Sequence, residues 1–366
     1  MTLQGLLFAA YAIPLTLIVL TSLVLAHEWG HFITARISKI RVLEFGIGFP
    51  PKAKTLGHDH ETEYTLNWLP IGGFCKLEGE DSDSDDPHAF GNARLWRQLV
   101  VLVAGVAMNV ILAFVLFLFV AVFFDPALGV KIDRLTPGGA AEKAGLVVGD
   151  TVDSINGQRY SFLASENILD AIGADAGKAV TIGYTDTQGV HRTINLTLGS
   201  DKSAGVLGIR SIDEQHSLQA VVTYTQNDPI TAAGKAADET VTSVSMIAQA
   251  LAKLGSQLVS NPTSAPSGAQ GPVGIARDFG VVLSDYGFPM VLLLAAVLSA
   301  NLALVNLLPF PPLDGGRMAI LVAKRIAGKR GVSAVEAMSY VVGFALLMGF
   351  LAWITFFDIV RGGLGS

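Results

Sequence analysis

The stretch LTSLVLAHEWGHFITARIS, residues 20–38, sets two histidines and a glutamate inside a run of apolar side chains. Ionisable side chains are costly within a bilayer, and those found in membrane-spanning helices are usually functional. His27, Glu28 and His31 form the pattern H-E-x-x-H. On a helix, positions i and i+4 share one face, so both imidazoles can bind the same metal ion. The alternative is a chance match to a short motif, which the cost of placing these three groups in an apolar helix disfavours.

The composition is that of a membrane protein with some soluble mass attached. The chain has 366 residues, of which 51% are hydrophobic and 15% charged, whereas soluble domains carry about 25% charged residues. The formal net charge is -6 and there is no long basic tract, so we expect no nucleic-acid partner. Cys75 is the one cysteine, which excludes an internal disulfide and is read as a small, partly buried side chain.

Four apolar stretches approach or exceed the roughly 20 residues that a bilayer-spanning helix needs. They cover about residues 3–37, 95–124, 286–308 and 335–359. The first has no lysine or arginine before Arg36, and its apolar run is too long for a signal peptide. We therefore expect it to be a retained transmembrane helix.

The segments between the spans differ in character. Residues 38–94 contain the strand-forming run TEYTLNWLPI and the turn signals GFPP and PIGG, which predict a small β-sheet. Their acidic run EGEDSDSDD is typical of a solvated loop. Residues 127–200 alternate strand-like runs with turns and predict a compact α+β module. Residues 201–270 form a linker, with apolar side chains at helical spacing over about 230–260, where an amphipathic helix is expected.

The predicted fold is a polytopic α-helical membrane protein with four transmembrane helices, a membrane-associated β-loop and an inserted α+β domain. The expected segments are 1–37, 38–94, 95–124, 127–200, 201–270, 271–330 and 335–361.

Lysine and arginine in the short loops predict the orientation of the spans, because cytoplasmic loops are enriched in both. They gather after the first span and after the third: Arg36, Lys39, Arg41, Lys52, Lys54, Lys76, Arg94 and Arg97; Arg317, Lys324, Arg325, Lys329 and Arg330. The N-terminus has none and the C-terminal tail has Arg361. We expect both basic loops in the cytoplasm, and both termini and residues 127–200 outside.

Two imidazoles and a hydrolytic motif favour one Zn²⁺ ion. Glu28 lies beside them in sequence and can take a proton from a metal-bound water. A third protein ligand is needed, and the other histidines lie outside the spans: His58, His60, His88, His191 and His216. His58 and His60 could form a second metal site, but a polar hairpin tip explains them better.

The better candidate for the third ligand is Asp314, in NLLPFPPLDGGR directly after the third apolar span. Prolines and glycines break a helix, so they can aim this carboxylate at the first span. The alternative for PLDGG is an ordinary turn. Its pairing with H-E-x-x-H at the edge of a span favours the metal site.

These two motifs together resemble the site-2 protease family of intramembrane zinc metalloproteases. The family signature is H-E-x-x-H in the first core span and N-x-x-P-x-P-x-L-D-G much later, here at residues 27–31 and 306–315. The closest resemblance is to the bacterial regulator-of-sigma-factor proteases, and GVKIDRLTPGGAAEKAGLVVGDTVDSINGQ resembles one copy of their PDZ domain. Trp29 departs from the smaller apolar residue common in relatives, and we expect it to change packing rather than metal binding.

The resemblance implies a protease of the bacterial inner membrane with its active site towards the cytoplasm and its PDZ-like domain outside. Its substrates would be single-span membrane proteins such as anti-sigma factors or remnant signal peptides, cut in or near their transmembrane segment within the lipid bilayer. An upstream site-1 protease would act first on the same substrate. The PDZ-like domain would then exclude substrates that are still bulky outside the membrane.

A substrate helix must be unwound and held extended, and an exposed strand edge can do this by β-addition. We predict this edge at Glu63, Tyr64, Thr65, Leu66, Asn67 and Trp68. Asn306 is predicted to bind the substrate backbone or to stabilise the oxyanion. For Asn301, a hydrogen bond between helices is the better interpretation.

Two other classes of function compete with a protease. A non-enzymatic membrane scaffold would use the PDZ-like module to bind partners and the metal for structure, but structural zinc has four protein ligands and only three are found. A metal or proton transporter would also use intramembrane histidine and aspartate. Transporters usually show internal repeats, and none is seen across the four spans.

Overall fold

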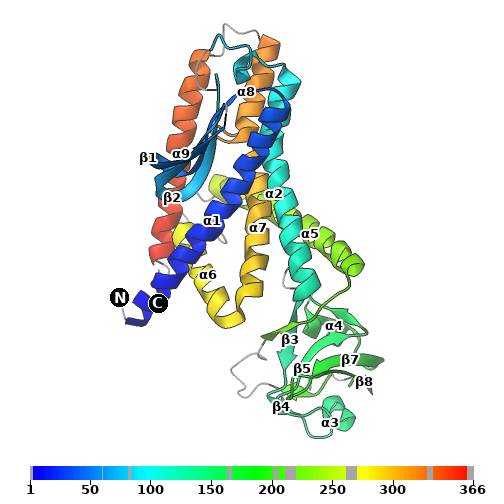
Figure 1. Ribbon diagram of the computed structural model, residues 1–366. Coiled ribbons are helices and arrows are strands. Elements are labelled where there is room, and N and C mark those ends of the chain that lie inside the picture. Colours follow the sequence, from blue (N-terminus) through cyan, green and yellow to red (C-terminus); the bar gives the residue numbers. More distant parts are fainter. Residues whose placement is uncertain are drawn as a thin grey trace. The chain divides into compact units, whose positions relative to one another are not determined.

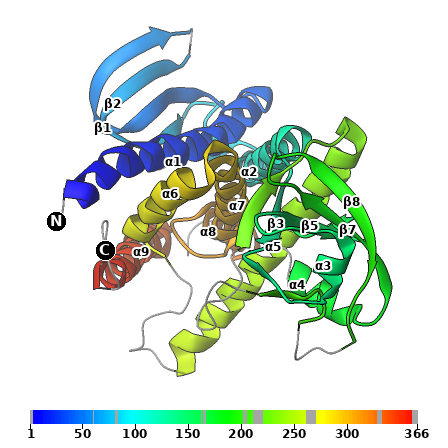
Figure 2. The ribbon, with the colours of Figure 1, turned by 90° about the horizontal axis from the view of Figure 1, so that it is seen from below.

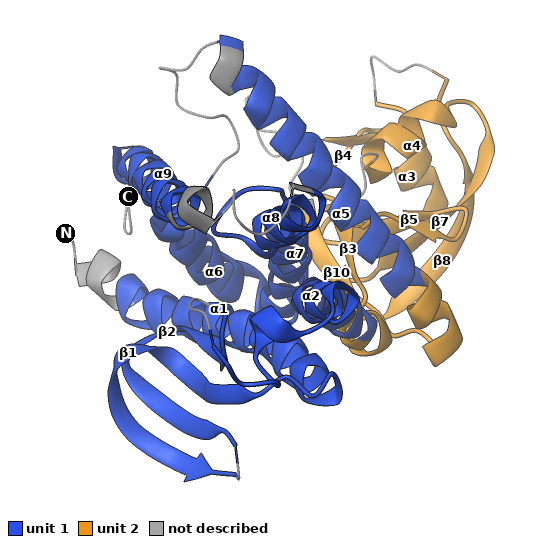
Figure 3. Cartoon of the chain, turned by 90° about the horizontal axis from the view of Figure 1, so that it is seen from above, with its two compact units in different colours: residues 1–118, 235–366 blue, residues 119–234 orange. Residues whose placement is uncertain are grey.

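The computed structural model describes residues 3–59, 61–80, 84–161, 163, 167–200, 205–210, 220–260, 270–327 and 333–360. The chain divides into two compact units. Unit 1 combines residues 1–118 with 235–366, and unit 2 is the segment 119–234 between them (Figure 3). Two long helices, at residues 95–123 and 229–260, each begin in one unit and end in the other.

Unit 1 is mainly helical (Figure 1). Its elements are α1 (Leu3–Ile37), β1 (Val42–His58), β2 (Glu63–Leu77), a 3-10 turn at Phe90–Asn92, α2 (Leu95–Phe123), α5 (Pro229–Ser260), α6 (Pro272–Tyr286), α7 (Phe288–Leu307), α8 (Asp314–Ala327) and α9 (Ser333–Val360). Helix α5 matches the amphipathic helix expected near 230–260, whereas the linker at 261–269 lies outside the described residues.

Four helices in the described part of the chain are long and apolar enough to cross a membrane. They contain the spans Phe8–Ile37, Leu95–Phe123, Phe288–Leu307 and Met338–Val360. Each overlaps one of the four stretches predicted from hydropathy. The chain is therefore an integral membrane protein with a polytopic helical fold.

The first two spans approach closely where the H-E-x-x-H motif lies. A Cβ added to Gly30 would stand 2.4 Å from the Ala104 carbonyl oxygen and 3.0 Å from Cβ of Met108. Glycine at this position therefore lets α1 lie directly against the backbone of α2. Small residues serve the same purpose at many transmembrane helix contacts. This packing brings α2 to the face of α1 that carries His27 and His31.

A buried carboxylate joins the last helix to the start of α6. Asp358 of α9 is 5% exposed, and one of its oxygens accepts hydrogen bonds from the backbone N–H groups of Gly271 and Gly274, at 2.8 and 2.9 Å. The free N–H groups at a helix N-terminus favour such a negative partner. The end of α9 thus holds the start of α6 in place.

The β1–β2 sheet lies against α1 (Figure 2) and corrects the predicted substrate edge. Residues 63–67 of β2 pair with 52–58 of β1, and residues 63–66 also pair with 44–47. The backbone from Glu63 to Leu66 is thus paired on both sides, so the prediction of an exposed edge is wrong for these four residues. The reason is that β1 turns back on itself around residues 48–51 and encloses this part of β2.

The edges of this sheet are instead residues 52–58 and 73–77. Residues 73–77 pair with β1 from Val42↔Leu77 to Ile47↔Gly73, and their other side faces α1. There, Thr21 accepts a hydrogen bond from the Gly72 N–H at 3.2 Å. This edge of the sheet therefore lies alongside α1.

Unit 2 is an α+β module built on antiparallel strands (Figure 1). Its elements are β3 (Pro126–Lys131), β4 (Arg134–Leu135), α3 (Ala140–Ala144), β5 (Thr151–Ile155), β6 (Gln158–Arg159), α4 (Ile168–Ala174), β7 (Ala179–Thr185), β8 (His191–Thr197), β9 (Ile209–Arg210) and β10 (Ala220–Tyr224). The main sheet has the order β10-β3-β5-β7-β8, with β6 paired to β5. Its core includes Ile132, Val152 and Ile182, each fully buried.

The module extends beyond the predicted limit of residue 200, because β10 forms one edge of its sheet. Strand β10 pairs with β3 from Ala220↔Val130 to Tyr224↔Pro126. The run AVVTY has strand propensity, but it follows a polar segment that the sequence pattern assigns to the linker. The chain therefore enters the module at Pro126 and leaves it at Tyr224, and these two residues are paired neighbours in the sheet.

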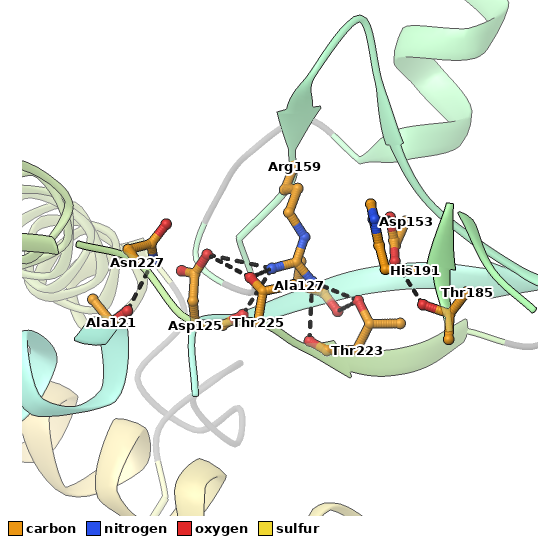
Figure 4. A network of polar contacts seen from close by, with 10 residues as sticks. All are labelled: Ala121, Asp125, Ala127, Asp153, Arg159, Thr185, His191, Thr223, Thr225 and Asn227. Carbon is orange, nitrogen blue, oxygen red and sulfur yellow. Dashed lines mark hydrogen bonds and ion pairs between the residues drawn. The ribbon is translucent and has the colours of Figure 1, made fainter. Parts of the chain in front are cut away.

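A single arginine holds this junction together (Figure 4). Arg159 of β6 donates to the backbone and carboxylate oxygens of Asp125 at 3.0 and 3.3 Å, and to the Thr223 hydroxyl at 2.7 Å. It also donates to the Thr225 hydroxyl. Because Asp125 directly precedes β3 and Thr225 directly follows β10, the arginine ties the first and last strands of the module to one point.

Candidate metal centre

The three predicted ligands meet in the structure. His27 and His31 lie one turn apart on α1, and Asp314 is the first residue of α8. Their ligand atoms all lie within 4.8 Å of one another. Asp314 Oδ2 is 2.9 Å from Nε2 of His27 and 3.4 Å from Nε2 of His31, and the two Nε2 atoms are 3.1 Å apart. No other such cluster of histidine, cysteine or carboxylate groups is found among the described residues.

This arrangement fits a zinc ion. Both histidines are buried, and Asp314 Oδ2 is buried without receiving a hydrogen bond of normal geometry. Two imidazole nitrogens and one carboxylate oxygen thus converge on one small space. Three protein ligands of this kind, with a fourth position left for water or substrate, are typical of catalytic zinc rather than structural zinc.

Helix α2 supplies the surroundings of both imidazoles. Nδ1 of His31 lies 2.8 Å from the Val101 carbonyl oxygen, and Nδ1 of His27 lies 3.2 Å from the amide of Asn109. Such partners fix the orientation of metal-binding histidines. The sequence patterns considered above did not include Asn109. An asparagine inside the apolar run VAGVAMNVILA is the signal that could have indicated it.

Gly105 of α2 leaves the room that the two imidazoles occupy. A Cβ at this position would lie 2.5 Å from Cε1 and Nε2 of His31 and 2.7 Å from Cε1 of His27. We expect Gly105→Ala to lower zinc affinity about 5- to 150-fold, because forcing a methyl group into a packed site costs about 1–3 kcal/mol. Zinc competition against a calibrated chelator measures this.

The matched control for Gly105→Ala is Gly349→Ala in α9. A Cβ at Gly349 meets no atom within 4 Å, so zinc affinity should stay at the wild-type value. Equal zinc affinity in the Gly105→Ala and Gly349→Ala proteins would show that the site tolerates the added methyl group.

Glu28 points towards the β1–β2 sheet. Its Oε2 accepts a hydrogen bond from the backbone N–H of Cys75 at 3.0 Å, on the sheet edge formed by residues 73–77. Burial, reinforced by the negative charges of Glu28 and Glu80, raises the pKa of the Cys75 thiol well above its ordinary value. A raised pKa favours the protonated thiol, and Cys75 is not among the residues whose ligand atoms cluster with His27, His31 and Asp314.

The break after α7 places Asp314 beside His27 and His31. Helix α7 ends at Leu307 and α8 begins at Asp314. One turn further on, Arg317 donates to Oε1 of Glu80, while Oε2 of Glu80 accepts from the Leu77 N–H at 3.3 Å. The start of α8 is therefore tied to the end of β2, next to the sheet edge that holds Glu28.

The other predicted residues lie at different places. Thr65 and Asn67 are buried within the β1–β2 sheet, and Asn67 donates to the Gly48 carbonyl at 3.1 Å, so both stabilise the sheet. Asn306 is half-buried in the last turn of α7. Trp29 stacks on Phe32, with ring centroids 5.1 Å apart, which places it on a packing face of α1 away from the ligands. His60 and His216 lie outside the described residues.

Comparisons with known proteins show the family of the chain. The family model of peptidase family M50 matches residues 15–350. A protein of Clostridium acetobutylicum named "Putative zinc metalloprotease" is 32% identical over 92% of this chain and 94% of its own length. Proteins of the same description from a Nostoc species and from Brucella suis are 31% and 28% identical, over 90% and 94% of this chain and 91% and 93% of their own lengths. The chain therefore belongs to peptidase family M50, the site-2 protease family, and is a membrane-embedded zinc metalloprotease rather than a scaffold or a transporter.

Proposed function

We propose that this protein cuts single-span membrane proteins in or near their transmembrane segment, using one zinc ion held by His27, His31 and Asp314. The observation that carries the proposal is the place where the three side chains meet. His27 and His31 lie on the apolar helix α1, and Asp314 follows the apolar helix α7. Glu28 is next to His27 in sequence. A soluble hydrolase has no need to build its site from membrane-spanning helices. Polar groups at membrane depth mark the place where substrate and water must come together.

Each polar residue of the site has a proposed role. A zinc ion held there supplies Lewis-acid activation of water and of the scissile carbonyl. Glu28 takes the proton from the attacking water and passes it to the leaving amine. Asn306, at the end of α7, holds the substrate backbone or donates to the developing oxyanion.

The substrate strand is proposed to add to the sheet edge formed by residues 73–77, displacing the contacts that Gly72 and Cys75 make there with α1. This edge is the one beside α1, and the Cys75 N–H is bonded to the proposed catalytic carboxylate. A substrate lying along it would have its carbonyl groups next to Glu28. Main-chain hydrogen bonds from a strand edge hold a peptide extended without requiring a particular sequence, which suits an enzyme that must first unwind a helix.

The active site is proposed to face the cytoplasm. The basic residues after the first and third spans favour this side. Two contacts are consistent with it: His27 near the end of the first span meets Asp314, and Glu80 from the first loop meets Arg317 from the second. Unit 2 follows the opposite end of α2 in sequence and would then lie outside, where we propose that it acts as a PDZ-like filter.

Excising residues 126–224 should allow cleavage of substrates whose extracytoplasmic part is still intact. Because Tyr224 pairs with Pro126, the cut ends can be rejoined by a short glycine–serine linker. The measurement is the ratio of cut to uncut substrate for full-length and pre-trimmed versions. The filter proposal fails if the excised enzyme cuts the pre-trimmed form but still leaves the full-length form intact.

Co-expression with candidate substrates tests the function itself. Anti-sigma factors and remnant signal peptides are the two substrate classes to compare, each as a tagged single-span protein. We expect a membrane-embedded cut with wild type and none with Glu28→Gln. If neither class is cut in or near its span while a soluble peptide is hydrolysed, the protein acts on another kind of substrate.

A further inference from the structure

The last span contacts the turn that carries Asp314, although none of its described residues belongs to the cluster of ligand atoms. Val341 and Phe344 of α9 are 67% and 55% exposed, whereas Gly343 between them is buried. A Cβ at Gly343 would overlap the Pro311 carbonyl oxygen and stand 2.7 Å from the carbonyl carbon. The missing side chain therefore lets the backbone of α9 lie directly against the turn.

The turn between α7 and α8 is itself tightly folded. A Cβ on Gly315 would overlap the Leu307 carbonyl oxygen. A Cβ on Gly316 would stand 2.5 Å from the carbonyl carbon of Phe310. The first turn of α8 has no room to shift against this backbone, because close-packed atoms transmit strain instead of absorbing it. Asp314 must therefore move together with the turn.

A second contact with α9 lies on the other side of Asp314. The Tyr340 ring faces the guanidinium of Arg317, whose central carbon lies 5.9 Å from the ring centroid. A cation within about 6 Å of an aromatic ring centroid is attracted to the ring face. Tyr340 and Gly343 are three residues apart and share one face of α9. Pro311 and Arg317 lie three residues before and three after Asp314, so α9 holds this segment on both sides.

We propose that Gly343 and Tyr340 are positioning residues that fix Asp314 opposite the two histidines. The inference rests on the proposed ligand role of Asp314. Gly343 acts on the backbone of the turn and Tyr340 acts on Arg317, so both influence the site through the segment that carries the carboxylate. A side chain added at Gly343 would push the turn, and the carboxylate with it, away from α9.

Four substitutions test this role. Gly343→Ala should weaken zinc binding about 5- to 150-fold, since a methyl group forced into a packed contact must displace the turn. Gly349→Ala lies on the same helix and its Cβ meets no atom within 4 Å, so zinc affinity should stay at the wild-type value. Tyr340→Leu should weaken zinc binding about two- to fivefold, as expected for the loss of one cation–π contact. Tyr340→Phe keeps the ring and should lie closer to wild type than Tyr340→Leu.

The measurements are zinc competition against a calibrated chelator, with the full-length protein in detergent, and visible absorption of the Co²⁺-substituted protein. The absorption bands depend on the arrangement of the ligands around the ion. Gly343→Ala should therefore shift the bands, whereas Gly349→Ala should leave them in place. A loss of stability that leaves the ligands in position would not move them.

Wild-type zinc affinity and unshifted bands in Gly343→Ala overturn the inference. If Gly343→Ala fails to fold, Tyr340→Leu decides, and wild-type zinc affinity in that variant overturns it. The ligand assignment is tested separately: wild-type zinc affinity in Asp314→Ala would refute the role of Asp314 in the proposed function.

Discussion

Glu28→Gln is expected to bind zinc as wild type does and to lose peptide-bond cleavage. Glutamine keeps the size of the side chain and can still accept the hydrogen bond from the Cys75 N–H, so the sheet edge and α1 should stay in place. What disappears is the carboxylate that takes and returns a proton. General acid–base groups contribute about 10²–10⁴-fold, and a group that serves both steps should fall at the upper end.

The measurement for Glu28→Gln is the cleavage rate of a tagged single-span substrate in detergent, with zinc content determined on the same preparation. Glu44→Gln is a matched control, because Glu44 is another glutamate of unit 1 and accepts a hydrogen bond from the Thr65 hydroxyl at 2.6 Å. It should retain cleavage within a few-fold. Wild-type cleavage by Glu28→Gln would remove Glu28 from the mechanism.

Asp314→Ala is expected to lose both zinc and activity. Without the carboxylate, two imidazoles remain, and zinc sites in proteins use three or four protein ligands. Asp314 Oδ2 lies 2.9 Å from Nε2 of His27 and 3.4 Å from Nε2 of His31, so its loss leaves both imidazoles without their shared partner. We expect the purified variant to contain less than about a tenth of the wild-type zinc after gel filtration, consistent with the loss of a whole ligand.

Asp358→Ala provides the control for Asp314→Ala. Both aspartates are partly or fully buried beside a helix N-terminus, but Asp358 binds the N–H groups of Gly271 and Gly274 rather than the histidines. Its loss should lower thermal stability, since removal of a capping side chain costs about 0.5–2 kcal/mol, and should leave zinc content unchanged. Full zinc retention in Asp314→Ala would mean that another group completes the site.

The sequence could predict the helices and the metal ligands because both have short-range signals. Apolar runs of membrane-crossing length identify the spans, and the spacing of His27 and His31 is fixed by the helix itself. Asp314 could be predicted as the third ligand because prolines and glycines mark a helix break next to it in sequence. The proximity of these groups needed only the assumption that two spans lie together.

What the sequence could not predict depends on contacts between distant residues. The run from Glu63 to Leu66 has strand propensity, but nothing in it reveals that β1 folds around it and pairs on both sides. The same holds for β10, which pairs with β3 across more than eighty residues of intervening chain. Gly105 is one glycine among 39, and its importance appears only when the imidazoles are seen against it.

The adjacency of Pro126 and Tyr224 in unit 2 has an evolutionary consequence. A module whose chain enters and leaves at neighbouring points behaves as a cassette. It can be lost, duplicated or exchanged without altering the length of chain needed to join the flanking helices. Arg159 sits inside the cassette, whereas Asp125 and Thr225 stay with the helices on either side. A replacement module would need a side chain that binds Asp125 and Thr225 as Arg159 does.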